Sequence, residues 1–148
     1  MISISAAPVV DHDDSTIPEE SLAAARAADT KSGDDTVILA MGELLGLTDA
    51  FVITSGRNSR QVKTIVDEVE RQVGDAYSRK PVRVEGLNDA RWVLMDYGDF
   101  LVHVFLDEAR EFYDLEHLWA DAPRVAWSAG AATGSDPSPD LSLTPELR

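Results

Sequence analysis

The carboxylates best placed for metal chemistry are Asp96 and Asp99, which are close together in the sequence on either side of Gly98. A site that transfers phosphoryl groups with two metal ions needs several oxygen ligands that converge on one point. Asp96 and Asp99 instead fall on opposite sides of a predicted turn, and residues 81–85 contain no Asp-x-Asp pair. The pattern of a catalytic metal site is therefore missing, and we expect no catalytic residue, metal or cofactor.

The three histidines, His12, His103 and His117, have a spacing that fits none of the common zinc patterns. The chain has no cysteine, which excludes disulfides, thiolate ligands and cysteine nucleophiles. His103 shares its side of an apolar stretch with Leu101 and Phe105. We therefore expect His103 to be a core or sheet-surface residue held by one hydrogen bond.

Residues 55–59, Ser-Gly-Arg-Asn-Ser, lie between a predicted strand and a predicted helix. Backbone N–H groups at such a junction can bind an anion. The segment lacks the Gly-Lys-Ser/Thr ending of a phosphate-binding P-loop. We expect an ordinary turn in which Asn58 or Ser59 begins the helix.

The stretch of residues 92–97 carries a binding signature. As a strand, it places Trp92, Leu94 and Asp96 on one face and Val93, Met95 and Tyr97 on the other. An aromatic ring beside a carboxylate is a common composition for an interface hot spot. The alternative is that Trp92 and Tyr97 belong to the core.

The formal net charge is −14, with 27 acidic and 13 basic residues and no basic stretch. Nucleic-acid binders gain affinity from clustered Lys and Arg, so direct RNA binding is not expected to dominate. A basic protein partner fits better, because complementary charge speeds encounter and orients docking. The alternative is that the acidity only keeps the protein soluble.

The elements that must position these residues follow from apolar periodicity. Thr16 and Glu19 have capping-box spacing, and the Ala-rich residues 22–28 predict a helix that ends near Lys31 and Gly33. An apolar stripe from Val62 to Val73 predicts a helix that starts at Asn58 or Ser59 and ends at Gly74. We predict strands at residues 36–41, 50–54, 81–84, 92–97 and 100–106, a turn or short helix at 42–48 and a closing helix at 110–119.

These elements predict an α/β fold, a single domain with a mixed five-stranded sheet flanked by helices. Gly98-Asp99 joins the last two strands in a hairpin, and Arg110 and Glu116, with Phe112 and Tyr113, are expected to tie the closing helix to the sheet. We assign residues 16–122 to the domain, 1–15 to a flexible lead and 123–148 to a disordered tail, with local packing of Val125 or Trp127.

From about Ala27 to Trp119 the sequence resembles the ribosomal silencing factors, also called the Iojap family. The order and spacing of several blocks carry this resemblance: residues 51–56, 59–62, 84–86, 92–99, 102–105, 110–116 and 118–119. The resemblance implies a scaffold related to nucleotidyltransferases. It also implies binding to the fourteenth protein of the large ribosomal subunit. The bound factor would block joining of the small subunit by steric exclusion, which represses translation and needs no catalytic group.

The resemblance points to the 92–97 region as the interface without settling which face is used. The candidate partner-binding residues are Glu85, Trp92, Leu94, Asp96, Tyr97 and Asp99. Two alternatives stay open: a nucleotide-handling enzyme that uses Asp96 or Asp99, and a homodimer paired through the exposed edge of the last hairpin. The N-terminus lacks a secretory signal and no apolar run approaches the length of a membrane span, so we expect a cytoplasmic protein.

Overall fold

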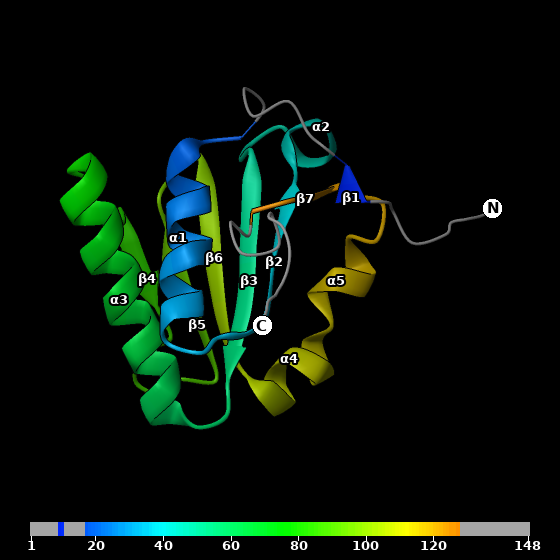
Figure 1. Ribbon diagram of the computed structural model, residues 1–148. Helices are drawn as coiled ribbons and strands as arrows, with labels where there is room; N and C mark the ends of the chain where they lie inside the picture. The colour runs from blue at the N-terminus through cyan, green and yellow to red at the C-terminus, as the bar shows by residue number, and fades with distance from the viewer. Residues whose placement is uncertain (1–8, 11–16, 128–148) are drawn as a thin grey trace, which may run out of the picture.

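The computed structural model describes residues 9–10 and 17–127 and shows a mixed sheet of seven strands in the order β1-β7-β2-β3-β6-β5-β4 (Figure 1). The two central strands, β3 and β6, pair in parallel, while β2 and β5 flank them in antiparallel. The strands are β1 Val9–Val10, β2 Asp34–Ala40, β3 Ala50–Gly56, β4 Arg83–Glu85, β5 Trp92–Asp96, β6 Phe100–Leu106 and β7 Arg124–Val125.

Helices pack on both faces of this sheet. The long helices α1 and α3 lie side by side over one face, and the short helices α4 and α5 follow β6 onto the other (Figure 1). The helices are α1 Glu19–Thr30, α2 Gly42–Leu45, α3 Ser59–Tyr77, α4 Asp107–Tyr113 and α5 Leu115–Leu118. The predicted α/β class and mixed sheet are confirmed.

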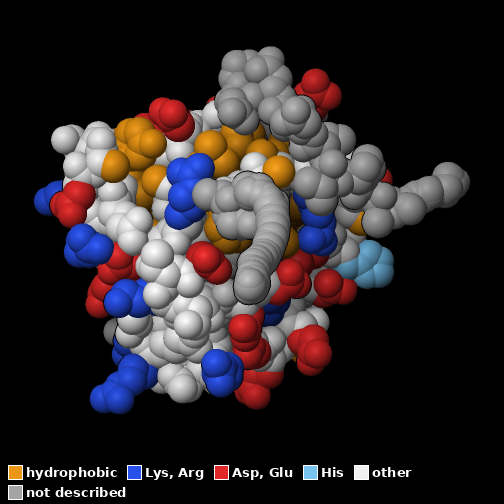
Figure 2. All heavy atoms as spheres, in the orientation of Figure 1, with side chains coloured by type: hydrophobic (Ala, Val, Ile, Leu, Met, Phe, Trp, Pro, Cys, Tyr) orange, Lys and Arg blue, Asp and Glu red, His pale blue; other side chains and the backbone are white. Residues whose placement is uncertain are grey.

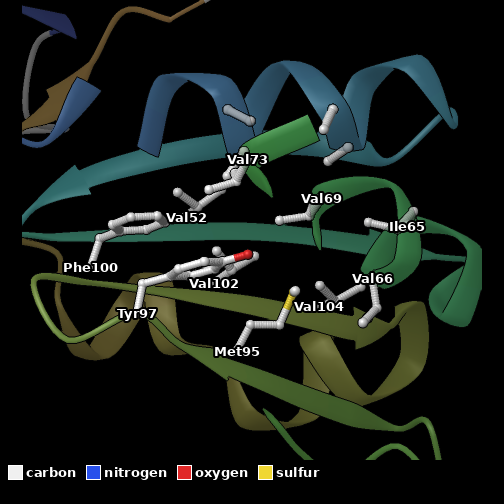
Figure 3. Packing of buried hydrophobic residues seen from close by; sticks show 14 of the residues in the cluster. Val52, Ile65, Val66, Val69, Val73, Met95, Tyr97, Phe100, Val102 and Val104 are labelled. Atoms are coloured by element: carbon white, nitrogen blue, oxygen red, sulfur yellow. The ribbon is translucent and has the colours of Figure 1, made fainter. Parts of the chain in front are cut away.

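The main core fills the space between the sheet and the helices α1 and α3 (Figure 3). The predicted apolar stripe of α3 is buried along its length, since Val62, Ile65, Val69 and Val73 are all 0% exposed. Alanines of α1 pack beside this stripe and let the two helices approach closely. A second, smaller cluster lies on the opposite face, where Phe105 meets residues of α4 and α5.

Several predicted helix ends differ from the structure. Helix α3 continues past Gly74 to Tyr77 and ends where Ser78 adopts a left-handed conformation. Pro18 is the N-cap of α1, so the predicted capping box is wrong, and Thr16 itself lies outside the described residues. The predicted closing helix is two short helices, because Asp114 takes a left-handed conformation with φ 50° between them.

The folded part reaches beyond the predicted boundary at residue 122. Strand β7 pairs in antiparallel with β2 and in parallel with β1, which adds two strands to the predicted five. The expected packing of Val125 and Trp127 is confirmed: Val125 is buried, and the Trp127 indole donates to the carbonyl of Thr36 at 2.9 Å. The rest of the predicted lead and tail lies outside the described residues.

Candidate functional site: an open sheet face

The end of the sheet formed by β4, β5 and β6 is covered differently on its two faces. Val84, Val93 and Met95 point toward α1 and α3 and pack in the main core. Cross-strand pairs place the intervening residues together on the opposite face, for example Leu94 beside Glu85 and Asp96 beside Leu101. We call this surface the open face; it consists of Arg83, Glu85, Trp92, Leu94, Asp96 and Leu101.

Tyr97 does not belong to the open face. Its side chain is 2% exposed and its ring stacks on Phe100 with centroids 4.6 Å apart, beneath α3 (Figure 3). Burial is the largest cause that raises the pKa of Tyr97 to about 12, followed by the charge of Glu70. The prediction that Tyr97 contacts a partner is therefore corrected, because its strand parity directs it into the main core.

Trp92 has a mixed position at the rim of the second cluster. Its ring is half-buried and lies 5.0 Å from the Phe105 ring and 4.7 Å from the Tyr113 ring, between centroids. The indole N–H donates to Nδ1 of His103 at 3.1 Å. This contact confirms the expectation that one hydrogen bond holds His103, and it fixes the orientation of the Trp92 ring.

His103 is a neutral residue inside the sheet. Its side chain is 5% exposed, and burial lowers its pKa from 6.5 to about 4. Because Nδ1 accepts from Trp92, the proton belongs on Nε2, which is buried and has no hydrogen-bond partner among the described residues. The ring packs edge-on against Phe51.

The carboxylates of the open face are held in place by Arg83. Its guanidinium lies 3.1 Å from Asp96 and 3.2 Å from Glu85. The second oxygen of Asp96 accepts from the backbone N–H of Gly98 at 2.8 Å. One arginine between two carboxylates leaves this corner of the face with one net negative charge.

Asp99 is oriented away from this group. It pairs with Arg79 at 2.8 Å, and Arg79 also reaches the carbonyl of Tyr97 and lies near Glu20 of α1. The Arg79 guanidinium stands over the rings of Tyr97 and Phe100, on the side of the main core. Asp96 and Asp99 therefore bind different arginines, and their oxygens do not converge. Among the residues that the structure describes, no group of three or more His, Asp or Glu side chains is arranged to hold a metal ion.

Arg110 anchors α4 to the sheet, as predicted. It forms two hydrogen bonds of 3.0 Å with Glu116 and donates to the carbonyls of Asp34 and Asp35 and to the hydroxyl of Ser55. These bonds use the guanidinium donors, so α4 cannot lift from β2 and β3 without breaking several of them.

The two aromatic residues of α4 behave differently from each other. Tyr113 packs on Trp92 and remains 46% exposed, whereas Phe112 is 77% exposed. The prediction that Phe112 helps to tie the helix to the sheet is wrong, because its position on α4 faces solvent. Exposed Phe112 and Tyr113 instead extend the apolar part of the open face at its rim.

A hollow of about 370 Å³ lies next to this rim. It is lined by Asp35, Ser55, Asp107, Arg110, Glu111, Asp114 and Glu116. Since Arg110 is the sole cation among these side chains and is already paired, the hollow is strongly acidic. It gives the α4 side of the molecule a negative surface close to the exposed aromatic rings.

The turn at residues 57–61 is held by hydrogen bonds between its own side chains and backbone N–H groups. The Asn58 side chain accepts from the Gln61 N–H at 2.8 Å, and the Gln61 side chain accepts from the Arg57 N–H at 2.8 Å. The expected capped turn is confirmed, with Asn58 as the capping residue.

Sequence reasoning missed Arg83 and Leu101 as members of the open face, and Tyr113 as a residue at its rim. Leu101 follows from the alternation that placed His103 and Phe105, and its register opposite Asp96 required only the hairpin. The positions of Arg83 and Tyr113 depend on how β4 and α4 pack against the rest of the fold, which no local sequence pattern predicts.

Comparisons with known proteins identify the chain. Residues 14–143 match the family model described as "Ribosomal silencing factor during starvation". A relative from Bacillus subtilis (strain 168), named ribosomal silencing factor, is 41% identical over 100 residues, which cover 68% of this chain and 84% of the relative. The chloroplastic protein Iojap of Zea mays is 29% identical over 113 residues, covering 76% of this chain and 49% of that protein.

Solved structures agree with these matches. A crystal structure of a protein from Chromobacterium violaceum is 33% identical and superposes with a TM-score of 0.66, covering 78% of this chain and 94% of the other. A crystal structure from Bacillus halodurans is 38% identical, with a TM-score of 0.60, and covers 70% of this chain and 92% of the other. The chain thus belongs to the family of ribosomal silencing factors.

Proposed function

We propose that this protein represses translation by binding a basic protein of the large ribosomal subunit through its open face. The bound molecule then excludes the small subunit from the joining surface. The partner that the family resemblance implies is the fourteenth protein of the large subunit. The protein acts by binding alone and turns over no substrate. The site of action is the cytoplasm.

The observation that supports this proposal most directly is the composition of the open face. Half-buried Trp92, Leu94 and Leu101 offer apolar surface that α4 and α5 leave uncovered. Trp92 is already oriented by His103 and Tyr113, so little side-chain entropy is lost when a partner packs against it. An anchored aromatic ring at the edge of an apolar patch is a typical hot spot.

Charge supports a basic partner on the same side of the molecule. Between residues 107 and 116 there are five acidic side chains, Asp107, Glu108, Glu111, Asp114 and Glu116, and one basic one. Most of them line or adjoin the acidic hollow beside Tyr113. Such a rim speeds encounter with a cationic surface and orients it.

The test is cosedimentation with purified large subunits, followed by a joining assay with small subunits. We expect the protein to pellet with free large subunits and to reduce joining when added in excess. Asp96→Arg should weaken binding by tenfold or more, because it places a second cation beside Arg83 and repels a basic partner. Asp75→Arg is the matched control, since Asp75 is exposed on α3, away from the open face.

Two results would contradict the proposal. One is a joining reaction that proceeds normally with the protein in excess. The other is equal binding by Asp96→Arg and Asp75→Arg when circular dichroism shows both to be folded. Cosedimentation with purified small subunits in a parallel run, and not with large ones, would overturn the choice of the large subunit.

A further inference from the structure

The Lys and Arg side chains of the described residues form two groups. Those in ion pairs with described carboxylates are Arg71, Arg79, Arg83, Arg91, Arg110 and Arg124. Those with no described carboxylate within 4.0 Å are Arg26, Lys31, Arg57, Arg60, Lys63 and Lys80. All members of the second group are exposed. A chain with a net charge of −14 therefore keeps a set of cations that form no close ion pair with its described acids.

Four of these cations gather where α3 begins. The Gln61 side chain donates to the carbonyls of Lys31 and Ser32 at 3.1 and 3.0 Å, which holds the end of α1 against the first turn of α3. Arg57 directly precedes the capping residue, and its N–H is bonded to the same glutamine. We call this group the basic end; it consists of Lys31, Arg57, Arg60 and Lys63.

Basic side chains predominate in the first two turns of α3, and Glu68, farther along the helix, interacts electrostatically with Lys31. Residues 57–66 contain three basic and no acidic side chains. Arg60 and Lys63 are three residues apart on α3 and so point to the same side of the helix. The aligned peptide dipoles of a 19-residue helix add positive potential at this terminus. Figure 2 shows basic side chains projecting at the lower left, where α3 begins, and acidic side chains gathered at the lower right.

The backbone of the turn is not the binding element. Asn58 and Gln61 already occupy N–H groups there, so an anion would meet the long side chains and not a nest of free amides. Flexible, exposed Lys and Arg side chains suit a row of separate charges better than one enclosed ion. The phosphates of a nucleic-acid backbone form such a row.

We infer that the basic end contacts the phosphate backbone of RNA beside the protein that the open face binds. The inference deepens the proposed function and rests on it, since docking on a ribosomal protein brings the rest of the molecule close to the RNA that surrounds such a protein. Four cations provide an accessory contact, which tunes affinity and orientation. The main source of affinity remains the open face, in keeping with the acidic charge of the whole chain.

The test compares two double variants that remove the same charge. Arg60→Gln/Lys63→Gln removes half of the basic end, and Arg26→Gln/Lys80→Gln removes two exposed cations outside it. Binding to large subunits is measured from 50 to 200 mM salt. Each lost phosphate contact lowers the slope of log affinity against log salt by about 1, so the first variant should lose about 2 from this slope. The control variant should keep the slope of the original protein.

A second measurement uses a short RNA hairpin alone, at low salt, with fluorescence anisotropy. We expect weak binding that falls several-fold in Arg60→Gln/Lys63→Gln and stays unchanged in the control. Equal slopes for the two variants on large subunits, with no difference on the hairpin, would overturn the RNA contact and leave the proposed function intact. If large subunits are not bound at all, the proposed function fails, and the hairpin result alone decides the RNA contact.

Other polyanions are tested in the same assay. Polyglutamate and vesicles that contain phosphatidylserine carry negative charge without the spacing of a sugar-phosphate chain. If either binds as tightly as the hairpin and responds equally to Arg60→Gln/Lys63→Gln, then the assignment to RNA is wrong. Preference for the hairpin supports it.

Discussion

The two faces of the β4–β5–β6 sheet end use alternate residues of the same strands for different purposes. On the face under α1 and α3, Val93, Met95 and Tyr97 are nearly or fully inaccessible. On the other face, Trp92, Leu94 and Asp96 stay partly exposed, because α4 and α5 are short and cover only the region around Phe105. Alternation along each strand therefore separates stability from binding: in β5, a change at Trp92, Leu94 or Asp96 should affect binding, and one at a covered residue should affect folding.

The largest effect is expected from truncation in the covered face. Phe100→Ala removes a fully buried ring that stacks on Tyr97, and should lower the free energy of unfolding by about 3–5 kcal/mol. Urea denaturation followed by circular dichroism measures this. The open-face residue Leu101 is adjacent in sequence, and Leu101→Ala should cost much less. Similar losses for both would break the distinction between the faces.

The second effect concerns His103, which orients the Trp92 ring of the open face. Its pKa is about 4 in the folded protein and 6.5 without burial, so the unfolded chain binds the proton first as the pH falls. The stabilisation that its neutral form provides is complete above pH 6.5 and lost as the pH falls toward 4, by up to about 3 kcal/mol. His103→Gln can still accept from Trp92 but does not titrate. Unfolding measured from pH 7 to 4 should show a shallower decline for that variant, and parallel curves would contradict the assignment.

The third effect tests the open face by charge. Leu94→Lys should weaken binding to large subunits by about 30-fold, equivalent to about 2 kcal/mol, since it places a cation in the apolar centre of the face. Because Leu94 is half-buried at the surface, unfolding should change by less than about 1 kcal/mol. Ala76→Lys, at an exposed position of α3, is the control. A binding loss shared by both variants would show that net charge alone is responsible.

The smallest effect is expected at the Tyr97 hydroxyl. This hydroxyl is buried and has no hydrogen-bond partner among the described residues. Tyr97→Phe therefore removes an unsatisfied polar group and should leave stability unchanged or raise it by up to about 1 kcal/mol. Binding to large subunits should be unaffected. A clear binding defect in this variant would return Tyr97 to the interface.

Local patterns predicted the parts of this fold that local forces decide. The valine stripe of α3 and the Gly98-Asp99 hairpin were predictable, because periodicity and turn residues report them directly. Which of Trp92 and Tyr97 is buried was not predictable. Alternation separates the two faces of a strand, but it does not say which face a helix covers. The break between α4 and α5 was also not predictable, because the left-handed conformation of Asp114 depends on how these helices pack. Strand β7 was missed because it pairs with a strand about 85 residues earlier in the chain.

Gly86 connects a block of the sequence to a backbone contact in the fold. Its φ is +92°, and a Cβ atom there would collide with the carbonyl oxygen of Trp92. The backbone after β4 therefore runs tightly against the start of β5, next to Glu85, which pairs with Leu94. The resemblance block of residues 84–86 thus has a steric reason in the structure.

The pairing of β1 with β7 has a practical consequence for work with this protein. Both ends of the described chain meet at one margin of the sheet, with β4 at the opposite margin. A fluorophore attached to β7 therefore lies toward the margin opposite β4, with β2, β3 and β6 between it and β5. Tethered probes at that margin provide a fixed reference from which the arrival of a ribosomal partner can be followed by energy transfer.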